Sequence, residues 1–335
     1  MTAPHAPRSM NRRRLASLGL AAWALLGGRG AAAQEWSART VRVVVPYPPG
    51  SGPDAVAREW AEQAAQLTGK AVIVDNKPGA NGMIGTDLVV RSAPDGATLL
   101  VLDPLSLVAN PYIYKSVPHV WQRDLRALNT LADADLFLFC SAKTPFRSVA
   151  EVVQYARQNP GKLNFGTVGN ASVEHLSVER LKAHTGIEVS RIPYTGMGQL
   201  IPALLSGEID LFVFGPLPFL GHLKDGRVRA LVAGSAQRSA VLPEVPTLAE
   251  AGLPADLFIG TTFTLLAPAR LPDSMAQEIV QWSENIVGQP KFREKFAARG
   301  LAARFDKGAS LAHWLRQSDQ RLGPLIRSLQ LPPLS

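Results

Sequence analysis

The residues of this chain that could bind or convert a ligand are mostly hydroxyl-bearing residues, asparagines and glycines. They are grouped in short turns. Among these turns only Lys77 supplies a basic side chain. Hydroxyl and amide groups, together with the free N–H groups at helix N-termini, can satisfy the lone pairs of a small carboxylate, and each such bond contributes about 1.5–3 kcal/mol. The sequence therefore favours reversible binding of an organic anion. The polar residues of the turns are Tyr47, Ser51, Asn81, Thr167, Asn170, Ser172, Tyr194 and Thr195.

An alternative interpretation is a secreted α/β hydrolase-like enzyme that uses Ser172, Glu174 and His175. Acyl transfer needs a nucleophile with a base in reach, but the chain has no GxSxG motif. Consecutive residues of a helix also point in different directions. We therefore expect no catalytic residues and no enzyme activity. A further alternative is a ligand-sensing receptor that docks on a signalling partner.

Metal and cofactor sites are not expected. Cys140 is the single cysteine, and the apolar run at 136–140 (LFLFC) indicates a buried strand residue. The six histidines are scattered, and no pair has metal-ligand spacing near a carboxylate. Neither a complete GxGxxG nor a GxxxxGK[ST] occurs, so a nucleotide cofactor has little support.

The formal charge of +8 has to be divided along the chain before it is interpreted. Five of the 35 basic residues stand in the first 33 positions, which hold no acidic residue, so the remainder has 30 basic and 27 acidic groups. This near balance argues against a nucleic-acid surface.

Residues 1–33 have the pattern of an export signal. A basic head at 12–14 precedes an apolar core at 15–26 and a small-residue end, with cleavage predicted after Ala33. The apolar core is short for a ~30 Å hydrocarbon layer, so we expect a cleaved signal and a mature chain outside the cytoplasm. The stretch NRRRL at 11–15 also resembles a twin-arginine signal.

The chain is organised around 41–58 (VRVVVPYPPGSGPDAVAR), which predicts a buried strand, a tight loop and a helix. Pro53 suits the start of the helix, and Asp54 favours the positive end of the helix dipole. The loop glycines are expected to leave backbone N–H groups open to an anion.

Further strands and helices alternate after this unit and predict a parallel sheet. Strands are expected at 71–75 and 98–103, with a helix at 82–91 between them. Ligands in such sheets lie beyond the carboxyl ends of the strands, so the tips at 47–52, 78–83 and 103–106 should face one cleft. Asp103 could enter that cleft or cap the following helix, and we favour the cap.

A second α/β module follows two apolar segments at 125–131 and 136–141. Its predicted strands cover 163–167, 188–193, 209–215 and 228–234, with glycine-rich tips at 166–172 (GTVGNAS) and 193–198 (PYTGMG). The apolar run at 263–267 would return the chain to the first module. These crossings divide the chain into a signal peptide at 1–33, lobe one at 34–137 plus 264–335, and lobe two at 138–263.

Six ordered blocks carry a family resemblance: VVVPYPPGSGPD, VDNKPGANGMIGTD, APDGATLL, GKLNFGTVGNASVEHL, PYTGMGQLIPALLSGEID and LPEVPTLAEAGLP. Over about 40–330 the chain resembles the Bug-type solute receptors of tripartite tricarboxylate transporters. The resemblance implies an α/β fold of the type II periplasmic binding protein kind, with two lobes, a central cleft and two crossover segments. It also implies a periplasmic monomer that closes on a small carboxylate and delivers it to a membrane permease, with no nucleic acid as partner.

The resemblance also implies a set of ligand-binding residues, drawn from the loops of both lobes. Asp54 matches the acidic residue of the family at the first helix, and we interpret it as a cap that organises the loop. The implied ligand-binding positions are Tyr47, Pro49, Gly50, Ser51, Gly52, Asn81, Met83, Thr167, Gly169, Asn170, Ser172, Tyr194 and Thr195.

Several of these positions depart from the family pattern. Ser51 stands where glycine is usual, and Met83 where asparagine is common. Thr195 stands in place of a lysine, and Phe214 in place of an aspartate that could hold an amino or hydroxyl group. We count Phe214 among the ligand-binding residues and expect a carboxylate with an apolar or aromatic body in preference to an amino acid.

Overall fold

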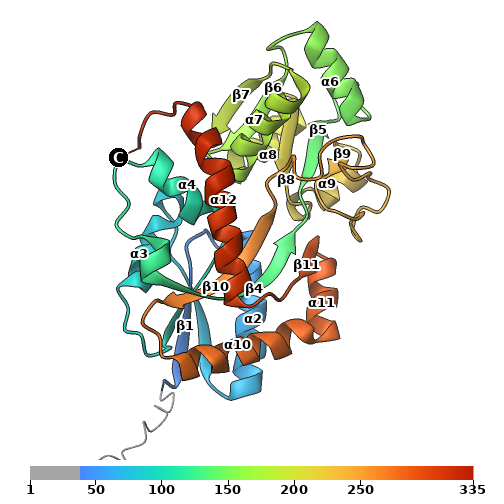
Figure 1. Cartoon of the computed structure of the whole chain (residues 1–335). Helices are drawn as coiled ribbons and strands as arrows, with labels where there is room; N and C mark the ends of the chain where they lie inside the picture. Colours follow the sequence, from blue (N-terminus) through green and yellow to red (C-terminus); the bar gives the residue numbers. More distant parts are fainter. Residues whose placement is uncertain (1–37, 335) are drawn as a thin grey trace, which may run out of the picture. The chain divides into compact units, whose positions relative to one another are not determined.

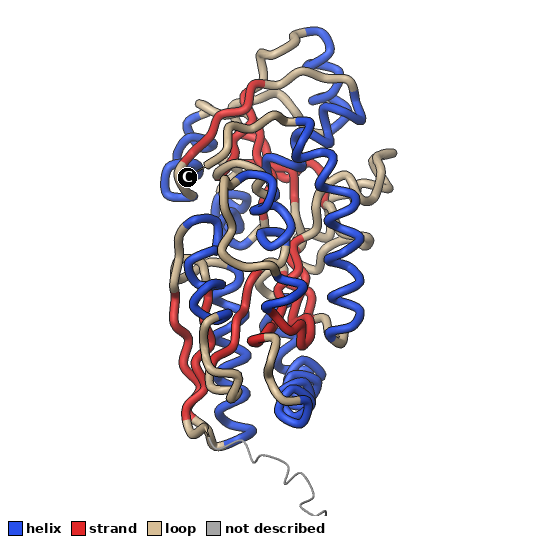
Figure 2. Tube along the Cα trace, turned by 60° about the vertical axis from the view of Figure 1, so that its left-hand side comes forward, coloured by secondary structure: helices blue, strands red, loops and turns tan. Residues whose placement is uncertain are grey.

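Two β-sheets organise residues 38–334, the part of the chain that the computed structural model describes, and Figure 2 shows their strands as two groups. The predicted export signal at 1–33 lies outside the described residues. The elements, labelled in Figure 1, are β1 (Thr40–Val45), α2 (Gly52–Thr68), β2 (Ala71–Asn76), η1 (Ala80–Gly82), α3 (Met83–Val90), β3 (Thr98–Leu102), α4 (Leu105–Ile113), α5 (Trp121–Asp124), β4 (Leu125–Ala134), β5 (Phe137–Ser141), α6 (Val149–Gln158), β6 (Asn164–Val168), α7 (Val173–Thr185), β7 (Ser190–Tyr194), α8 (Met197–Ser206), β8 (Leu211–Phe214), η2 (Leu217–Phe219), α9 (Leu220–Lys224), β9 (Val228–Ala233), β10 (Thr261–Pro268), α10 (Asp273–Gly288), α11 (Pro290–Ala297), β11 (Leu301–Ala303) and α12 (Gly308–Ser328).

The first sheet has the strand order β11-β4-β10-β3-β1-β2. β1 runs parallel to β2 and β3, as predicted, while β10 lies antiparallel between β3 and β4. The parallel arrangement predicted for the first three strands is confirmed, and antiparallel strands complete the sheet. The chain reaches β10 directly from the second sheet, without a helical crossover within the first sheet. An antiparallel strand needs no such crossover.

The second sheet has the order β7-β6-β8-β5-β9. β6 runs parallel to β7 and β8, and β5 runs antiparallel to β8 and β9. Two segments join the sheets, one between β4 and β5 and the other between β9 and β10. The chain thus crosses twice, as predicted, but the apolar run at 263–267 is part of β10 in the first sheet, and the return crossing lies before it.

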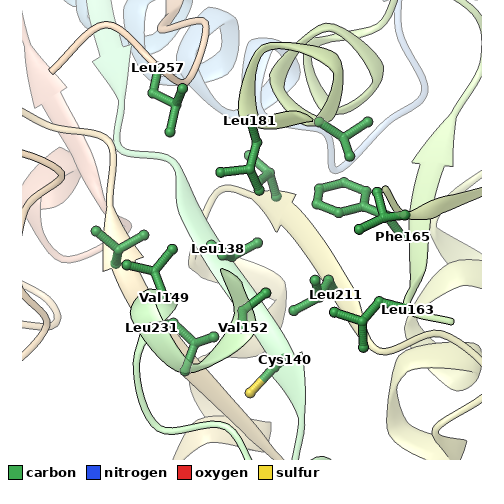
Figure 3. Packing of buried hydrophobic residues seen from close by; sticks show 14 of the residues in the cluster. Leu138, Cys140, Val149, Val152, Leu163, Phe165, Leu181, Leu211, Leu231 and Leu257 are labelled. Atoms are coloured by element: carbon green, nitrogen blue, oxygen red, sulfur yellow. The ribbon is translucent and has the colours of Figure 1, made fainter. Parts of the chain in front are cut away.

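Alternation along β8 explains how the second sheet is covered on both faces. Leu211 and Val213 belong to one apolar cluster, which α6 and α7 cover, while Phe212 and Phe214 belong to the cluster under α8. Figure 3 shows the first of these clusters, in which Cys140 points among leucines and valines. Cys140 is fully buried in β5, so the prediction of a buried strand residue is confirmed.

The first sheet carries an apolar cluster that α4 and α12 cover. α12 runs past α4 and β4 (Figure 1), and its residues Leu315 and Ile326 belong to the same cluster as Leu100 of β3. The same cluster takes in Ala171 and Leu176, at the start of α7 from the second sheet. None of the helices in the described part of the chain is long and apolar enough to cross a membrane.

Candidate functional site

The three tips of the first sheet lie together, as the parallel strand order predicts. The Asn76 amide group donates a hydrogen bond to the Tyr47 carbonyl at 3.1 Å, which joins the β1 and β2 tips. A Cβ on Gly82 would lie 3.6 Å from Pro46 and 3.7 Å from the Ser106 hydroxyl, so the β2 and β3 tips also meet at the β1 loop. Burial and the nearby Asp103 raise the pKa of the Tyr47 phenol. The predicted convergence of these tips is confirmed.

Asp54 organises the loop after β1. Its carboxylate accepts hydrogen bonds from the Gly50 amide at 2.8 Å, from Asn76 at 2.8 Å and from Arg58 at 3.0 Å. Burial by itself raises the pKa of Asp54, but the bonds from Arg58, Gly50 and Asn76 outweigh it, and the pKa lies below its usual value. The interpretation of Asp54 as a loop organiser is confirmed.

This arrangement corrects one expectation about the loop. The Gly50 amide is occupied by Asp54, and the Ser51 amide donates to the Pro48 carbonyl at 3.3 Å, so neither is open to an anion. What the loop does offer is the Ser51 side chain. Ser51 precedes α2 without making a capping bond, and its buried hydroxyl has no partner among the described residues. Pro49 is exposed and Gly52 half-buried beside it.

Asn81 and Met83 occupy the second tip. Asn81 has a left-handed backbone (φ 48°) and exchanges hydrogen bonds with Asn110, which receives the Asn81 amide at 2.7 Å and donates to the Asn81 carbonyl at 3.1 Å. Asn110 is buried in α4, so it holds this tip against the third one. Met83 begins α3 and is buried.

The first glycine-rich loop of the second sheet directs its side chains inward. Thr167 is fully buried, and its hydroxyl accepts a hydrogen bond from Arg191 at 3.2 Å. Ser172 caps α7 by accepting the His175 amide at 3.3 Å. Between them Gly169 has a φ of 80° and Asn170 is half-buried. The hydroxyls of Thr167 and Ser172 thus already serve the fold, and Arg191 is a nearby cation that sequence reasoning missed.

Tyr194, Thr195 and Phe214 make their described contacts within the second sheet and its helices. The Tyr194 hydroxyl donates to Glu208 at 2.8 Å, and burial together with this carboxylate raises the pKa of Tyr194 to about 12. Thr195 donates to Gln199 at 2.9 Å, and Phe214 stacks on Phe212. The structure therefore does not join these three residues directly to the first-sheet tips.

Two buried acids, one after β3 and the other in the first turn of α7, have raised pKa values that sequence reasoning did not anticipate. Asp103 accepts the Leu105 amide at 3.0 Å, which confirms the predicted capping role. Burial raises the pKa of Asp103 to about 7, against the Leu105 bond, and the charge of Glu174 adds to the rise. Burial likewise raises the pKa of Glu174 to about 6, although Ser172 and backbone amides bond to it. Strand order alone could have flagged Asp103, but nothing in the sequence signals the effect of the Glu174 charge on its pKa.

Ser172, Glu174 and His175 are not arranged for nucleophilic catalysis. Nδ1 of His175 accepts the Ala171 amide at 3.1 Å, and Nε2 lies 4.0 Å from Glu179. Burial, with the charges of Arg191 and Lys182, lowers the pKa of His175 to about 4, so the ring is neutral near pH 7. Both ring nitrogens are thus directed toward groups other than the Ser172 hydroxyl, which a general base would have to reach.

No group of three or more metal-binding side chains occurs within residues 38–334. A groove of about 500 Å³ lies elsewhere, between α6 and the end of α7. It is lined by residues such as Val153, Arg157 and Leu253, and none of the predicted site residues contributes to it.

Comparison with known proteins agrees with this fold. The model of the tripartite tricarboxylate transporter family receptor matches residues 56–331. Protein BugT of Bordetella pertussis is 30% identical over 80% of this chain and 82% of its own length. An R. palustris protein solved with adipate superposes with a TM-score of 0.80 at 26% identity, covering 90% of this chain and 100% of that one. MatC from Rhodopseudomonas palustris, solved with bound malate, superposes with a TM-score of 0.74 at 25% identity. The match covers 86% of this chain and 98% of MatC. The fold is the two-lobed α/β fold of periplasmic binding proteins, and the chain belongs to the family of tripartite tricarboxylate transporter receptors.

Proposed function

We propose that this protein captures a small organic carboxylate between two lobes outside the cytoplasm and delivers it to a permease of the tripartite tricarboxylate type. Lobe one comprises residues 34–137 plus 264–335, and lobe two comprises residues 138–263. Membership of the receptor family supports this role, as do the adipate and malate found with related proteins. The mature protein in this proposal lacks residues 1–33, is periplasmic and is a monomer.

One observation carries the proposal: residues next to a polar loop of each sheet pack on one apolar cluster. Tyr47 from the first sheet and Val173 from the second pack on the same apolar cluster. In the β1 loop, Ser51 offers a buried hydroxyl without a partner among the described residues, next to the N-terminus of the 17-residue helix α2. A hydroxyl and helix amides favour an anion there without a buried countercharge.

We propose no enzyme activity, because a receptor needs its ligand unaltered and His175 does not face Ser172. Hydrolysis of generic esters by the purified protein would overturn this part of the proposal. The role of a ligand sensor for a signalling partner uses the same binding step, and it would be distinguished by whether deletion of the protein abolishes uptake or only the response.

The apolar character of the ligand remains part of the proposal. The remaining predicted positions, Pro49, Gly50, Gly52, Asn81, Met83, Thr167, Gly169, Asn170, Ser172, Tyr194, Thr195 and Phe214, are proposed to surround the ligand when the lobes close on it. Met83 and Phe214 contribute apolar surface from the two lobes, which favours a carboxylate with an apolar or aromatic body over an amino acid.

A ligand-dependent melting screen tests the function. Adipate, malate, citrate, aspartate and aromatic acids are added to the mature chain, because binding to the folded state raises its stability by RT ln(1 + [L]/Kd). We expect at least one carboxylate without an amino group to raise the melting temperature. If no organic acid does so, the proposal fails. If aspartate alone does so, the preference for an apolar body fails.

The variant Ser51→Ala tests whether the ligand binds at the predicted loop after β1. The hydroxyl of Ser51 has no partner among the described residues, so its removal should leave the melting temperature of the free protein nearly unchanged. Loss of one bond to a charged ligand should weaken binding by about 10- to 100-fold. Ser92→Ala is the matched control, since that hydroxyl bonds the Val89 carbonyl away from the tips. Equal affinities of the two variants would move the site elsewhere.

A further inference from the structure

The second tip of the first sheet has an unusual backbone. Its four residues 79–82 have successive positive φ angles of 130°, 46°, 48° and 85°. Glycine adopts such angles readily, but Ala80 and Asn81 each carry a Cβ atom that makes them unfavourable. Only four non-glycine residues in the described part of the chain have a positive φ, and two of them are adjacent here. The tip therefore keeps a left-handed turn that two of its own residues oppose.

Hydrogen bonds inside the turn do not account for this conformation. The Gly82 amide donates to the Gly79 carbonyl at 3.0 Å, and the Met83 amide donates to the Ala80 carbonyl. Both acceptors belong to exposed residues, so water can take the place of these bonds. A strained turn persists only where the surrounding structure determines it. A contact from outside the turn is therefore needed to hold it.

Asn110 supplies this contact from α4. It lies 29 positions after Asn81 in the sequence and is 2% exposed. Its Oδ1 accepts a hydrogen bond from Nδ2 of Asn81 at 2.7 Å, and its own Nδ2 donates to the Asn81 carbonyl at 3.1 Å. A single buried side chain thus binds both the side chain and the backbone of one strained residue.

The Asn81 carbonyl fixes the orientation of both side-chain amides. A carbonyl oxygen can only accept, so the group of Asn110 that faces it must be the NH₂ group. The oxygen of Asn110 then faces the side chain of Asn81, which must present its own NH₂ group. Neither amide can turn over without placing two acceptors against each other. The two residues therefore fit in one arrangement, and this arrangement requires the left-handed turn.

Close packing fixes the end of the turn in the same way. A Cβ on Gly82 would lie 3.6 Å from Pro46 of the β1 loop, and a Cβ on Gly85 would lie only 2.9 Å from it. The start of α3 therefore rests on the β1 loop, while Asn110 holds the middle of the turn against α4. Asn81 and Met83 lie between these two points of attachment.

We propose that Asn110 is a positioning residue of the solute site, which holds Asn81 and Met83 in place for the ligand without touching the ligand itself. The inference rests on the proposed function, in which these two residues surround the ligand. A ligand that binds only the left-handed tip loses apparent affinity in proportion to the fraction of molecules that have this tip. The bonds from Asn110 keep that fraction close to one.

The variant Asn110→Asp tests this role with almost no change of shape. An ionised carboxylate accepts from the Asn81 side chain but repels the Asn81 carbonyl, whereas a protonated carboxyl can accept and donate as asparagine does. Burial raises the pKa of the introduced carboxyl above its usual value of about 4. By calorimetry, the acid among adipate, malate, citrate and benzoate that binds the parent most tightly should bind the variant about 10- to 30-fold more weakly at pH 8. At pH 5 the two affinities should agree within about threefold.

Two controls separate positioning from a general loss of stability. The parent is titrated at both pH values, because native acids such as Asp103, whose pKa is about 7, change charge in the same range. Ser283→Ala removes a buried hydroxyl that accepts the Trp60 indole N–H at 3.0 Å, between α10 and α2 and outside the tips. This control should lower the urea midpoint and leave the affinity for the acid unchanged.

A second pair of variants works through the backbone, so that a folding defect in Asn110→Asp cannot hide the result. Ala80→Gly removes a Cβ that opposes the left-handed turn, and Ala80 is exposed and outside the predicted ligand positions. By itself this variant should bind the acid at least as tightly as the parent. Combined with Asn110→Ala, which removes both bonds, it should restore at least about threefold of the lost affinity.

Amide hydrogen exchange follows the turn without any ligand. The Gly82 and Met83 amides are bonded within the left-handed turn, so both should exchange at least about tenfold faster in Asn110→Ala than in the parent. Equally slow exchange in the two proteins overturns the inference. An affinity that is unchanged in Asn110→Asp at pH 8, or is weakened equally at pH 8 and pH 5, also overturns it.

These results also distinguish this inference from the proposed function. If an organic acid binds the parent and the Asn110 variants equally well, the receptor function stands and the positioning role fails. If no organic acid binds the parent, the proposed function fails, and the positioning role fails with it.

Discussion

Replacing Asp54 with asparagine should destabilise the loop that follows β1, although the two side chains have the same shape. One carboxylate oxygen accepts the Asn76 amide, while the other accepts the Gly50 amide and Arg58. An asparagine has one oxygen and one NH₂ group, so it can satisfy only one of these two sides. The Asn76 side chain cannot simply turn over, because it also donates to the Tyr47 carbonyl and accepts from Arg58.

The size of the effect can be worked from these contacts. Asp54 is 2% exposed, so a bond lost there is not replaced by water. One hydrogen bond to a charged group contributes about 1.5–3 kcal/mol, and the remaining bonds weaken when their acceptor becomes neutral. The Arg58 ion pair adds little, since that arginine is 53% exposed. We expect a loss of about 2–4 kcal/mol, or roughly 4–8 °C at about 2 °C per kcal/mol for a chain of this size.

The assay is urea denaturation of the mature chain at pH 7, with Asp75→Asn as control. Asp75 contacts Arg42 at 3.6 Å and Lys77 at 3.2 Å near the surface, so its loss should cost less than about 1 kcal/mol. Because the pKa of Asp54 is lowered in the folded protein, its contribution is full above pH ~4 and is lost as the pH falls through the folded value. Equal stabilities of the Asp54 and Asp75 variants at pH 7 would refute the reasoning.

Two further predictions concern the second sheet. Gly166→Ala would place a Cβ onto Ile209 Cδ1 and 3.2 Å from Leu200, so we expect a loss of about 1–3 kcal/mol in the free energy of unfolding, and an unchanged urea midpoint would contradict this packing. Tyr194→Phe removes the bond to Glu208 at a half-buried site and should cost about 1 kcal/mol in the free energy of unfolding. In a spectrophotometric titration, the variant should also lack the phenol that ionises near pH 12. If that ionisation persists in the variant, another tyrosine is responsible.

Much of the fold follows from local patterns in the sequence. The valines at 43–45, followed by Pro48 and Gly50, predict the strand and the loop that the structure contains, since these turn residues cannot continue a strand. The helix at 173–185 begins where Ser172 offers a capping hydroxyl and ends at Gly186 in a left-handed conformation. Such signals depend on neighbouring residues alone, so they can be read without knowing how the chain folds.

The sequence by itself therefore determined the alternation of strands and helices, the two crossings, the family and the polar inventory of the tips. Only the tertiary structure decided how those polar groups are used. It assigns the Gly50 amide to Asp54 and the Thr167 hydroxyl to Arg191, and it buries Asp103 and Glu174. These outcomes depend on strand register and on the packing of segments that are distant in sequence, and such contacts leave no periodic trace in the order of the residues.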